Sequence, residues 1–133
     1  MGFLEEILIY FKKLEKTYGG LIVCGDFNIA HKNIDIHDPV SNKDSSGFLP
    51  EERSWMDHLT EQGFVDTFRH VHGEAKDRYS WWSFRQRSRE RNKGWRLDYF
   101  FVSQNLAKGI EAADIHPLIM GSDHCPVTLE IKA

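Results

Sequence analysis

The first residues of the chain show apolar side chains at a helical period. Charged residues fill the positions between the apolar ones, which are Phe3, Leu4, Ile7, Leu8, Phe11 and Leu14. This spacing places the apolar side chains on one face, which is typical of an amphipathic α-helix. The pair Gly19-Gly20 is typical of residues that follow a helix. The pattern therefore predicts an amino-terminal helix that ends near Tyr18.

Two further segments can be interpreted from the same pattern. Residues 21–24 (Leu-Ile-Val-Cys) are continuously apolar, which favours a strand buried on both faces. Residues 35–50 are rich in Asp, Ser, Asn, Gly and Pro, which indicates a long surface loop.

A second helix is predicted to begin at Pro50, because proline is favoured in the first turn. Trp55, Met56 and Leu59 would face inward, and Gly63 would end this helix.

The rest of the chain favours strands. A short extended piece is expected at 64–68 and an aromatic strand at 79–84. Further strands are expected at 97–102, 110–115 and 127–131. Helices mixed with several strands in one chain of 133 residues predict a single layered α/β or α+β domain over 1–133.

The composition indicates in which cellular compartment the protein resides. No apolar run approaches the roughly 20 residues that cross a bilayer, and the amino terminus does not resemble a secretory signal. We therefore expect no membrane partner and an intracellular, cytoplasmic protein. Cys24 and Cys125 have no metal-ligand spacing and are expected to be small buried thiols.

The net charge of −3 is distributed unevenly along the chain. Residues 76–96 hold eight basic and two acidic residues, so this segment carries +6 and the remainder carries −9. A basic segment on an acidic body fits phosphate attraction beside an acidic catalytic centre. A solvated charged loop is the alternative that composition leaves open.

Three short segments place acids beside predicted strand ends. Asp26 and Asn28 follow the first apolar strand in Gly-Asp-Phe-Asn, where a turn that satisfies its own backbone is the alternative interpretation. Asp98 enters an apolar strand, so it should be partly buried and need a partner such as histidine. Asp123 and His124 are adjacent in a turn, where one could meet a metal and the other a phosphate or Asp98.

Together these residues form a set suited to metal-assisted phosphodiester hydrolysis. A water-orienting base, an Asp–His pair and a hard oxygen ligand are the parts that this reaction needs.

The same segments, with their neighbours, resemble the exonuclease III/abasic-site endonuclease family. The resemblance runs in order from about Leu21 to Ile131. Its motifs are GDFNIAH (25–31), FLPEER (48–53), VDTFR (65–69), YSWW (79–82), GWRLDY (94–99) and SDHCPV (122–127). Trp81-Trp82 and Trp95-Arg96-Leu97 point to the abasic-endonuclease branch.

The resemblance implies a fold and an activity. It implies the carboxy-terminal half of a four-layer α/β sandwich of the DNase I-like type. This half would hold one mostly antiparallel or mixed sheet with helices on one face. It also implies a DNA repair phosphodiesterase that uses Mg²⁺, with Mn²⁺ as an alternative. The substrate would be double-stranded DNA, cut 5′ to abasic sites, with 3′–5′ exonuclease activity in addition.

The resemblance also implies residue roles. Asp26 would prepare the attacking water, and Asn28 would hold the phosphate. Asp98 would orient His124 against the scissile phosphate, and Asp123 would help to hold Mg²⁺. An apolar pocket would accept the flipped abasic sugar, and Arg85 would approach the minor groove. The pocket residues would be Trp81, Trp95 and Leu97.

The resemblance covers only the second half of the family's domain. The first half supplies an Asn, the principal metal-binding Glu and a catalytic Tyr in the family. We therefore expect the isolated chain to be weakly active or inactive. An exposed apolar sheet face should favour a homodimer or association with a missing amino-terminal half. The alternatives are a non-catalytic DNA-binding or self-associating fragment and one chain of a split nuclease.

Overall fold

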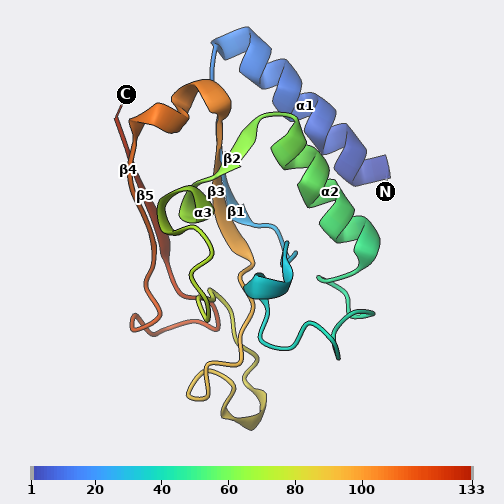
Figure 1. Cartoon of the computed structure of the whole chain (residues 1–133), viewed down its shortest axis with the longest axis vertical. Helices are drawn as coiled ribbons and strands as arrows, with labels where there is room; N and C mark the ends of the chain where they lie inside the picture. The colour runs from blue at the N-terminus through green and yellow to red at the C-terminus, as the bar shows by residue number, and fades with distance from the viewer. Residues whose placement is uncertain (1, 133) are drawn as a thin grey trace.

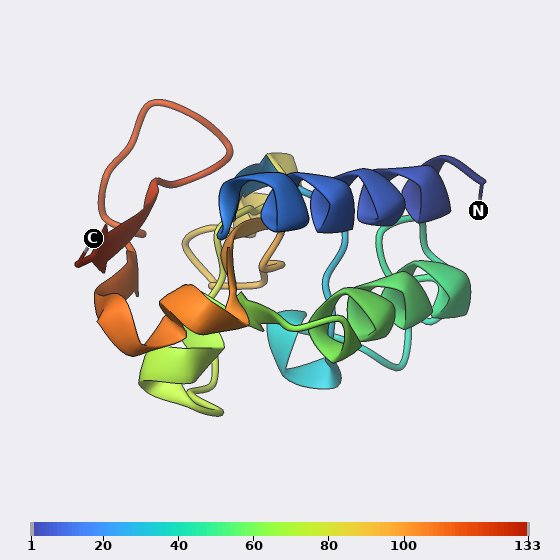
Figure 2. The ribbon, with the colours of Figure 1, turned by 90° about the horizontal axis from the view of Figure 1, so that it is seen from above.

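The computed structural model of the chain describes residues 2–132 and shows two helices packed beside antiparallel strands (Figure 1). Helix α1 spans Gly2–Tyr18 and α2 spans Pro50–Glu61. The two helices lie side by side in both views (Figures 1 and 2). Both predicted helices are thus confirmed, and Trp55, Met56 and Leu59 are buried as expected.

The strands pair only in the antiparallel sense, in two sheets. The first sheet has the order β1-β3-β2, with β1 at Ile22–Asp26, β2 at Phe64–Asp66 and β3 at Asp98–Ser103. The second pairs β4 (Ile110–Ile115) with β5 (Val127–Ile131), two strands whose positions were predicted from the sequence. The α/β class and the antiparallel pairing agree with the prediction, and the pairing is divided between two sheets.

Short elements connect these layers. Helix α3 spans Thr67–His72 directly after β2, and the Asp66 side chain accepts a hydrogen bond from the backbone N–H of Arg69 at its start. The sequence predicted only an extended piece here, because six residues are too few to show a helical period. Short 3₁₀ helices lie at Asn33–Asp35, Arg85–Arg87 and Gln104–Gly109.

Separate apolar clusters form around β3 and between α3 and β4. Tyr99 and Phe101 pack with residues of α1, α2 and β2: Leu8, Trp55, Met56, Leu59 and Phe64. A second cluster joins α3 and β4 through Phe68, Tyr79, Trp82, Ile115 and Cys125. β3 is therefore the rigid centre of the molecule, and the ends of its neighbours are held in place by packing on it.

Two expectations about strands are wrong. Residues 21–24 are not buried on both faces, because nothing within residues 2–132 covers the face of β1 that carries Ile22 and Cys24, and Ile22 remains 44% exposed. Cys24 is correspondingly exposed, whereas Cys125 is buried. Residues 79–84 form no strand, because Trp81 makes only isolated bridges, one with Trp95 and one with His124.

A buried ionic cluster fixes the start of β3. Arg96 is 1% exposed, and its Nε donates to Asp35 Oδ1 at 2.7 Å while its Nη atoms donate to Asp66. Arg69 donates to the same Asp35 oxygen at 2.6 Å. The cluster joins the 33–35 turn, β2 and α3 to the residues that precede Asp98.

In residues 2–132 no helix is both long and apolar enough to cross a membrane.

Candidate active site

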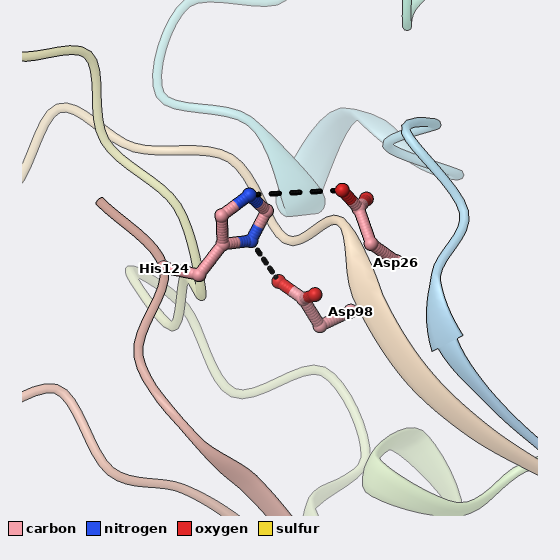
Figure 3. Close-up of side chains that lie close together, drawn as sticks. All are labelled: Asp26, Asp98 and His124. Atoms are coloured by element: carbon pink, nitrogen blue, oxygen red, sulfur yellow. Dashed lines mark hydrogen bonds and ion pairs between the residues drawn. The ribbon is translucent and has the colours of Figure 1, made fainter. Parts of the chain in front are cut away.

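Asp26, Asp98 and His124 converge at the ends of β1 and β3 (Figure 3). The His124 ring nitrogen Nδ1 lies 2.8 Å from Oδ2 of Asp98, within hydrogen-bond distance. The other ring nitrogen, Nε2, faces Asp26 Oδ2 at 3.6 Å. The imidazole therefore lies between two carboxylates that come from neighbouring strands.

Strand register explains why the two acids meet. In the antiparallel pair β1–β3, Asp26 is directly opposite Asp98. Asn28 follows with φ of 55°, a left-handed conformation that asparagine tolerates. Its backbone N–H donates to Asp26 Oδ1 at 2.8 Å, so the turn holds the Asp26 carboxylate in place.

Ser80 supports the Asp98 end of the pair. Its side chain is fully buried, and its Oγ accepts hydrogen bonds from the backbone N–H groups of Leu97 at 3.0 Å and Asp98 at 3.1 Å. Trp81 forms isolated β-bridges with Trp95 and with His124. These bridges hold the motif segments 79–82, 94–99 and 122–127 beside one another. Sequence reasoning missed Ser80, since nothing local distinguishes this serine from any other.

The environment shifts the protonation of the pair. Burial alone would lower the pKa of His124, but the hydrogen bond and the charge of Asp98, with the charges of Asp26 and Asp123, raise this pKa above its ordinary value. Burial raises the pKa of Asp98, against the lowering effect of hydrogen bonds to His124 and Ser80. The pair therefore keeps a proton on His124 at a higher pH than an isolated histidine would.

Asp123 lies beside this pair but has another partner. The indole Nε1 of Trp81 donates to Asp123 Oδ2 at 3.0 Å, and this bond lowers the pKa of the carboxyl group. Within residues 2–132, the side chains whose ligand atoms lie within 4.8 Å of one another are Asp26, Asp98 and His124. Asp123 is thus near the cluster without belonging to it.

A pocket of about 640 Å³ opens beside His124. It is lined by three residues predicted for an apolar sugar pocket, Trp81, Trp95 and Leu97, and also by Asn28, Asp123, His124, Ser45 and Ser46. The rings of Trp81 and Trp95 meet edge to face with centroids 6.0 Å apart. The structure therefore brings most of the predicted site residues to one cavity. The two serines lie in the polar 35–50 loop, which carried no signal.

Gly47 allows the 45–48 segment to close over this pocket. Its φ is +96°, and a Cβ at this position would come within 2.8 Å of the Trp95 ring. Only glycine fits this close approach without displacing the ring.

Arg85 is the predicted site residue that lies apart. It is exposed at the start of the Arg85–Arg87 turn and does not line the pocket. Other members of the basic segment are engaged within the protein. Arg96 is in the buried ionic cluster, and Arg89 donates to backbone carbonyl groups of Pro117, Ile119 and Ser122. The charge count of 76–96 thus overstates the positive charge available to a ligand.

Comparison with known proteins agrees with this geometry. Residues 1–124 match the model of the Endonuclease/Exonuclease/phosphatase family. An exodeoxyribonuclease of Bacillus subtilis is 47% identical over 128 residues, which are 96% of this chain and 50% of that protein. The DNA repair nuclease APEX1 of Danio rerio is 44% identical, over 82% of this chain and 35% of its own length.

The fold is similar to that of a solved relative. The crystal structure of an AP endonuclease from Leishmania major matches with a TM-score of 0.92 and 34% identity, covering 98% of this chain and 43% of that one. This chain therefore spans half or less of the length of each of these three relatives. The resemblance of its motifs to exonuclease III and abasic endonucleases is confirmed, and the chain belongs to the endonuclease/exonuclease/phosphatase family.

Proposed function

We propose that this chain carries part of the active site of a DNA repair phosphodiesterase. The reaction is Mg²⁺-dependent hydrolysis of the DNA backbone 5′ to abasic sites, with 3′–5′ exonuclease activity in addition. The observation that carries the proposal is the His124 imidazole, which lies between Asp98 and Asp26 at the mouth of a tryptophan-lined pocket. The names of the relatives, an exodeoxyribonuclease and an AP endonuclease, support the same reaction.

Asp26, Asn28 and His124 each have a separate role in this reaction. Asp26 accepts the proton of the attacking water, since its carboxylate is 35% exposed and held by the Asn28 backbone. The Asn28 side chain holds a phosphate oxygen without adding charge. His124, kept protonated by Asp98, donates to the scissile phosphate and stabilises its developing negative charge.

The donor set fits a hard cation. The carboxylate oxygens of Asp123 and Asp26 are the ligand type that Mg²⁺ prefers, with Mn²⁺ as the alternative, and Mg²⁺ commonly keeps water and phosphate as its other ligands. When bound, the cation would polarise the phosphoryl oxygen. Asp123 would be its ligand from this chain.

The pocket supports the choice of an abasic substrate. Trp81, Trp95 and Leu97 form apolar walls that would accept a deoxyribose without its base. Arg85 is free to approach the minor groove because it is exposed on the basic loop. The partner is therefore double-stranded DNA that contains abasic sites, in the cytoplasmic compartment that holds the DNA.

A second surface supports association with another polypeptide. The edge strand β1 and the nearby end of α1 expose apolar side chains, including Ile22 at 44% and Tyr18 at 75%. Edge strands of this kind favour pairing with another chain. We propose that a second copy or an amino-terminal half of the domain covers this region. Sedimentation of the chain as a monomer at micromolar concentration would contradict the homodimer.

Incision of a labelled duplex with one abasic analogue tests the proposed activity. We expect cutting 5′ to the lesion that requires Mg²⁺, stops in EDTA and is lost in Asp98→Asn. Because the chain spans half or less of its relatives, the rate of the isolated chain should be low.

The exposed edge strand β1 also favours a second candidate, in which the chain is one part of a split nuclease or a fragment that binds DNA without cutting it. DNA binding with no incision, before and after a partner half is supplied, would favour the non-catalytic fragment.

A further inference from the structure

A second cavity lies beside the proposed active site. It has a volume of about 590 Å³ and lies between the basic loop at 82–90 and the segment 117–123. Asp123 lines both this cavity and the pocket that holds Trp95. The two cavities are therefore neighbours on either side of one residue.

Arg89 joins the two walls of this second cavity. Its Nη1 donates to the carbonyl oxygen of Ser122 at 2.8 Å, and its Nη2 donates to those of Pro117 and Ile119 at 2.9 Å each. The guanidinium also lies 4.6 Å from the centroid of the Trp82 ring. The cavity is thus built into the fold, because one side chain holds both loops in position.

The rim of the cavity combines apolar side chains with an exposed ion pair. Phe84 is 85% exposed, Leu118 is 91% exposed and Met120 is 71% exposed. Arg87 and Glu90, also lining residues, form an ion pair at 3.5 Å between Nε and Oε2, and their side chains are 80% and 71% exposed. Exposed apolar side chains that gather in one patch are typical of interaction and ligand-binding sites, whereas single ones are common on any protein surface.

This composition fits one class of ligand. A nucleobase has flat apolar faces that pack on aromatic and apolar side chains, and an exposed guanidinium can stack on the same faces. A paired base cannot offer those faces, because they are stacked inside the duplex and only its edges reach a groove.

We infer that the second cavity takes an unpaired nucleobase, adjacent along the strand to the nucleotide in the Trp81–Trp95 pocket. This inference rests on the proposed function. Asp123, which both cavities share, explains why their occupants would be neighbours in one strand. The preferred substrate class is then DNA in which the nucleotide beside the lesion is mismatched or frayed.

The test measures DNA binding in EDTA by fluorescence anisotropy, so it does not depend on turnover. Two labelled duplexes of equal length carry the same abasic analogue, and the neighbouring base is paired in one and mismatched in the other. The wild-type chain should bind the mismatched duplex more tightly. Burial of one Leu or Met side chain contributes about 1.5–3 kcal/mol, so Leu118→Ser/Met120→Ser should weaken that binding about tenfold and leave the paired duplex within about twofold.

Matched variants separate the cavity from general surface effects. Ile119 and Val40 are 53% and 79% exposed, and neither lines the cavity, so Val40→Ser/Ile119→Ser should retain the preference. Phe84→Ser, on the opposite wall, should reduce it as the first double variant does. These side chains are exposed, so all variants should give the circular dichroism spectrum of the wild type.

The outcomes distinguish this inference from the proposed function. Equal affinity of the wild type for both duplexes, equal losses on both in the cavity variants, or the same loss in the matched control would overturn the inference alone. A wild-type chain that binds neither duplex would overturn the inference together with the proposed DNA substrate.

Discussion

Replacing Asp98 with asparagine perturbs the proposed site most selectively. Asparagine keeps the shape and can still accept a hydrogen bond from His124, but it removes the charge that lies 2.8 Å from the ring. A hydrogen bond to a charged group contributes about 1.5–3 kcal/mol, and a neutral one about 1 kcal/mol. Because His124 is 29% exposed and solvent screens the pair, the difference should be about 1 kcal/mol.

The loss should depend on pH in a defined direction. The folded-state pKa of His124 is raised, so its contribution to stability is fully present below the ordinary histidine pKa and is lost as the pH rises through the raised value. Urea unfolding should therefore show that Asp98→Asn lowers the free energy of unfolding at about pH 6, and that the loss shrinks at about pH 9.

An NMR titration of His124 supplies the direct check. In Asp98→Asn its pKa should fall, because burial still lowers it while the main opposing charge is gone. Asp114→Asn is the matched control, since Asp114 contacts His72 and not His124. An unchanged His124 titration in Asp98→Asn, or an equal change in the control, would refute the reasoning.

Three further predictions follow from the structure. Trp95→Ala should reduce abasic-site incision at least about tenfold more than it reduces affinity for intact DNA, and equal losses would contradict the pocket assignment. Arg96→Met should lower the free energy of unfolding by about 3–5 kcal/mol in urea, because Asp35 and Asp66 lose their buried partner. Burial lowers the pKa of His31, so wild-type stability should fall relative to His31→Gln as the pH drops below 6.5; parallel curves would contradict this.

Local pattern was sufficient for the long elements. The helical period at Leu4–Leu14 and the alternation at 127–131 predicted α1 and β5. An element that buries one face repeats its apolar residues at the period of that element, so the spacing alone identifies it. The same reasoning failed for β1. A continuous apolar run indicates burial on both faces only where both faces are covered, and the pattern does not reveal that one face of β1 is exposed.

For similar reasons, some residues of the site could be predicted from the sequence and others could not. Asp26, Asp98 and His124 were proposed from motifs, and the structure brings them together. Ser80 and Arg89 were missed, because their partners lie 17 or more positions away in the chain and no spacing rule predicts such contacts. The charge count also could not show that Arg89 and Arg96 bind protein atoms rather than face a ligand.

One measurement tests the central claim most directly, namely that Asp26, Asp98 and His124 cleave phosphodiesters. The chain is mixed with the amino-terminal half of the Bacillus subtilis relative, complex formation is verified by sedimentation, and a duplex with one abasic analogue is added with Mg²⁺ or EDTA. We expect Mg²⁺-dependent cutting 5′ to the lesion that falls at least about a hundredfold in both Asp98→Asn and His124→Ala. A verified complex that does not cut, or one whose cutting is unaffected by either substitution, would contradict the claim.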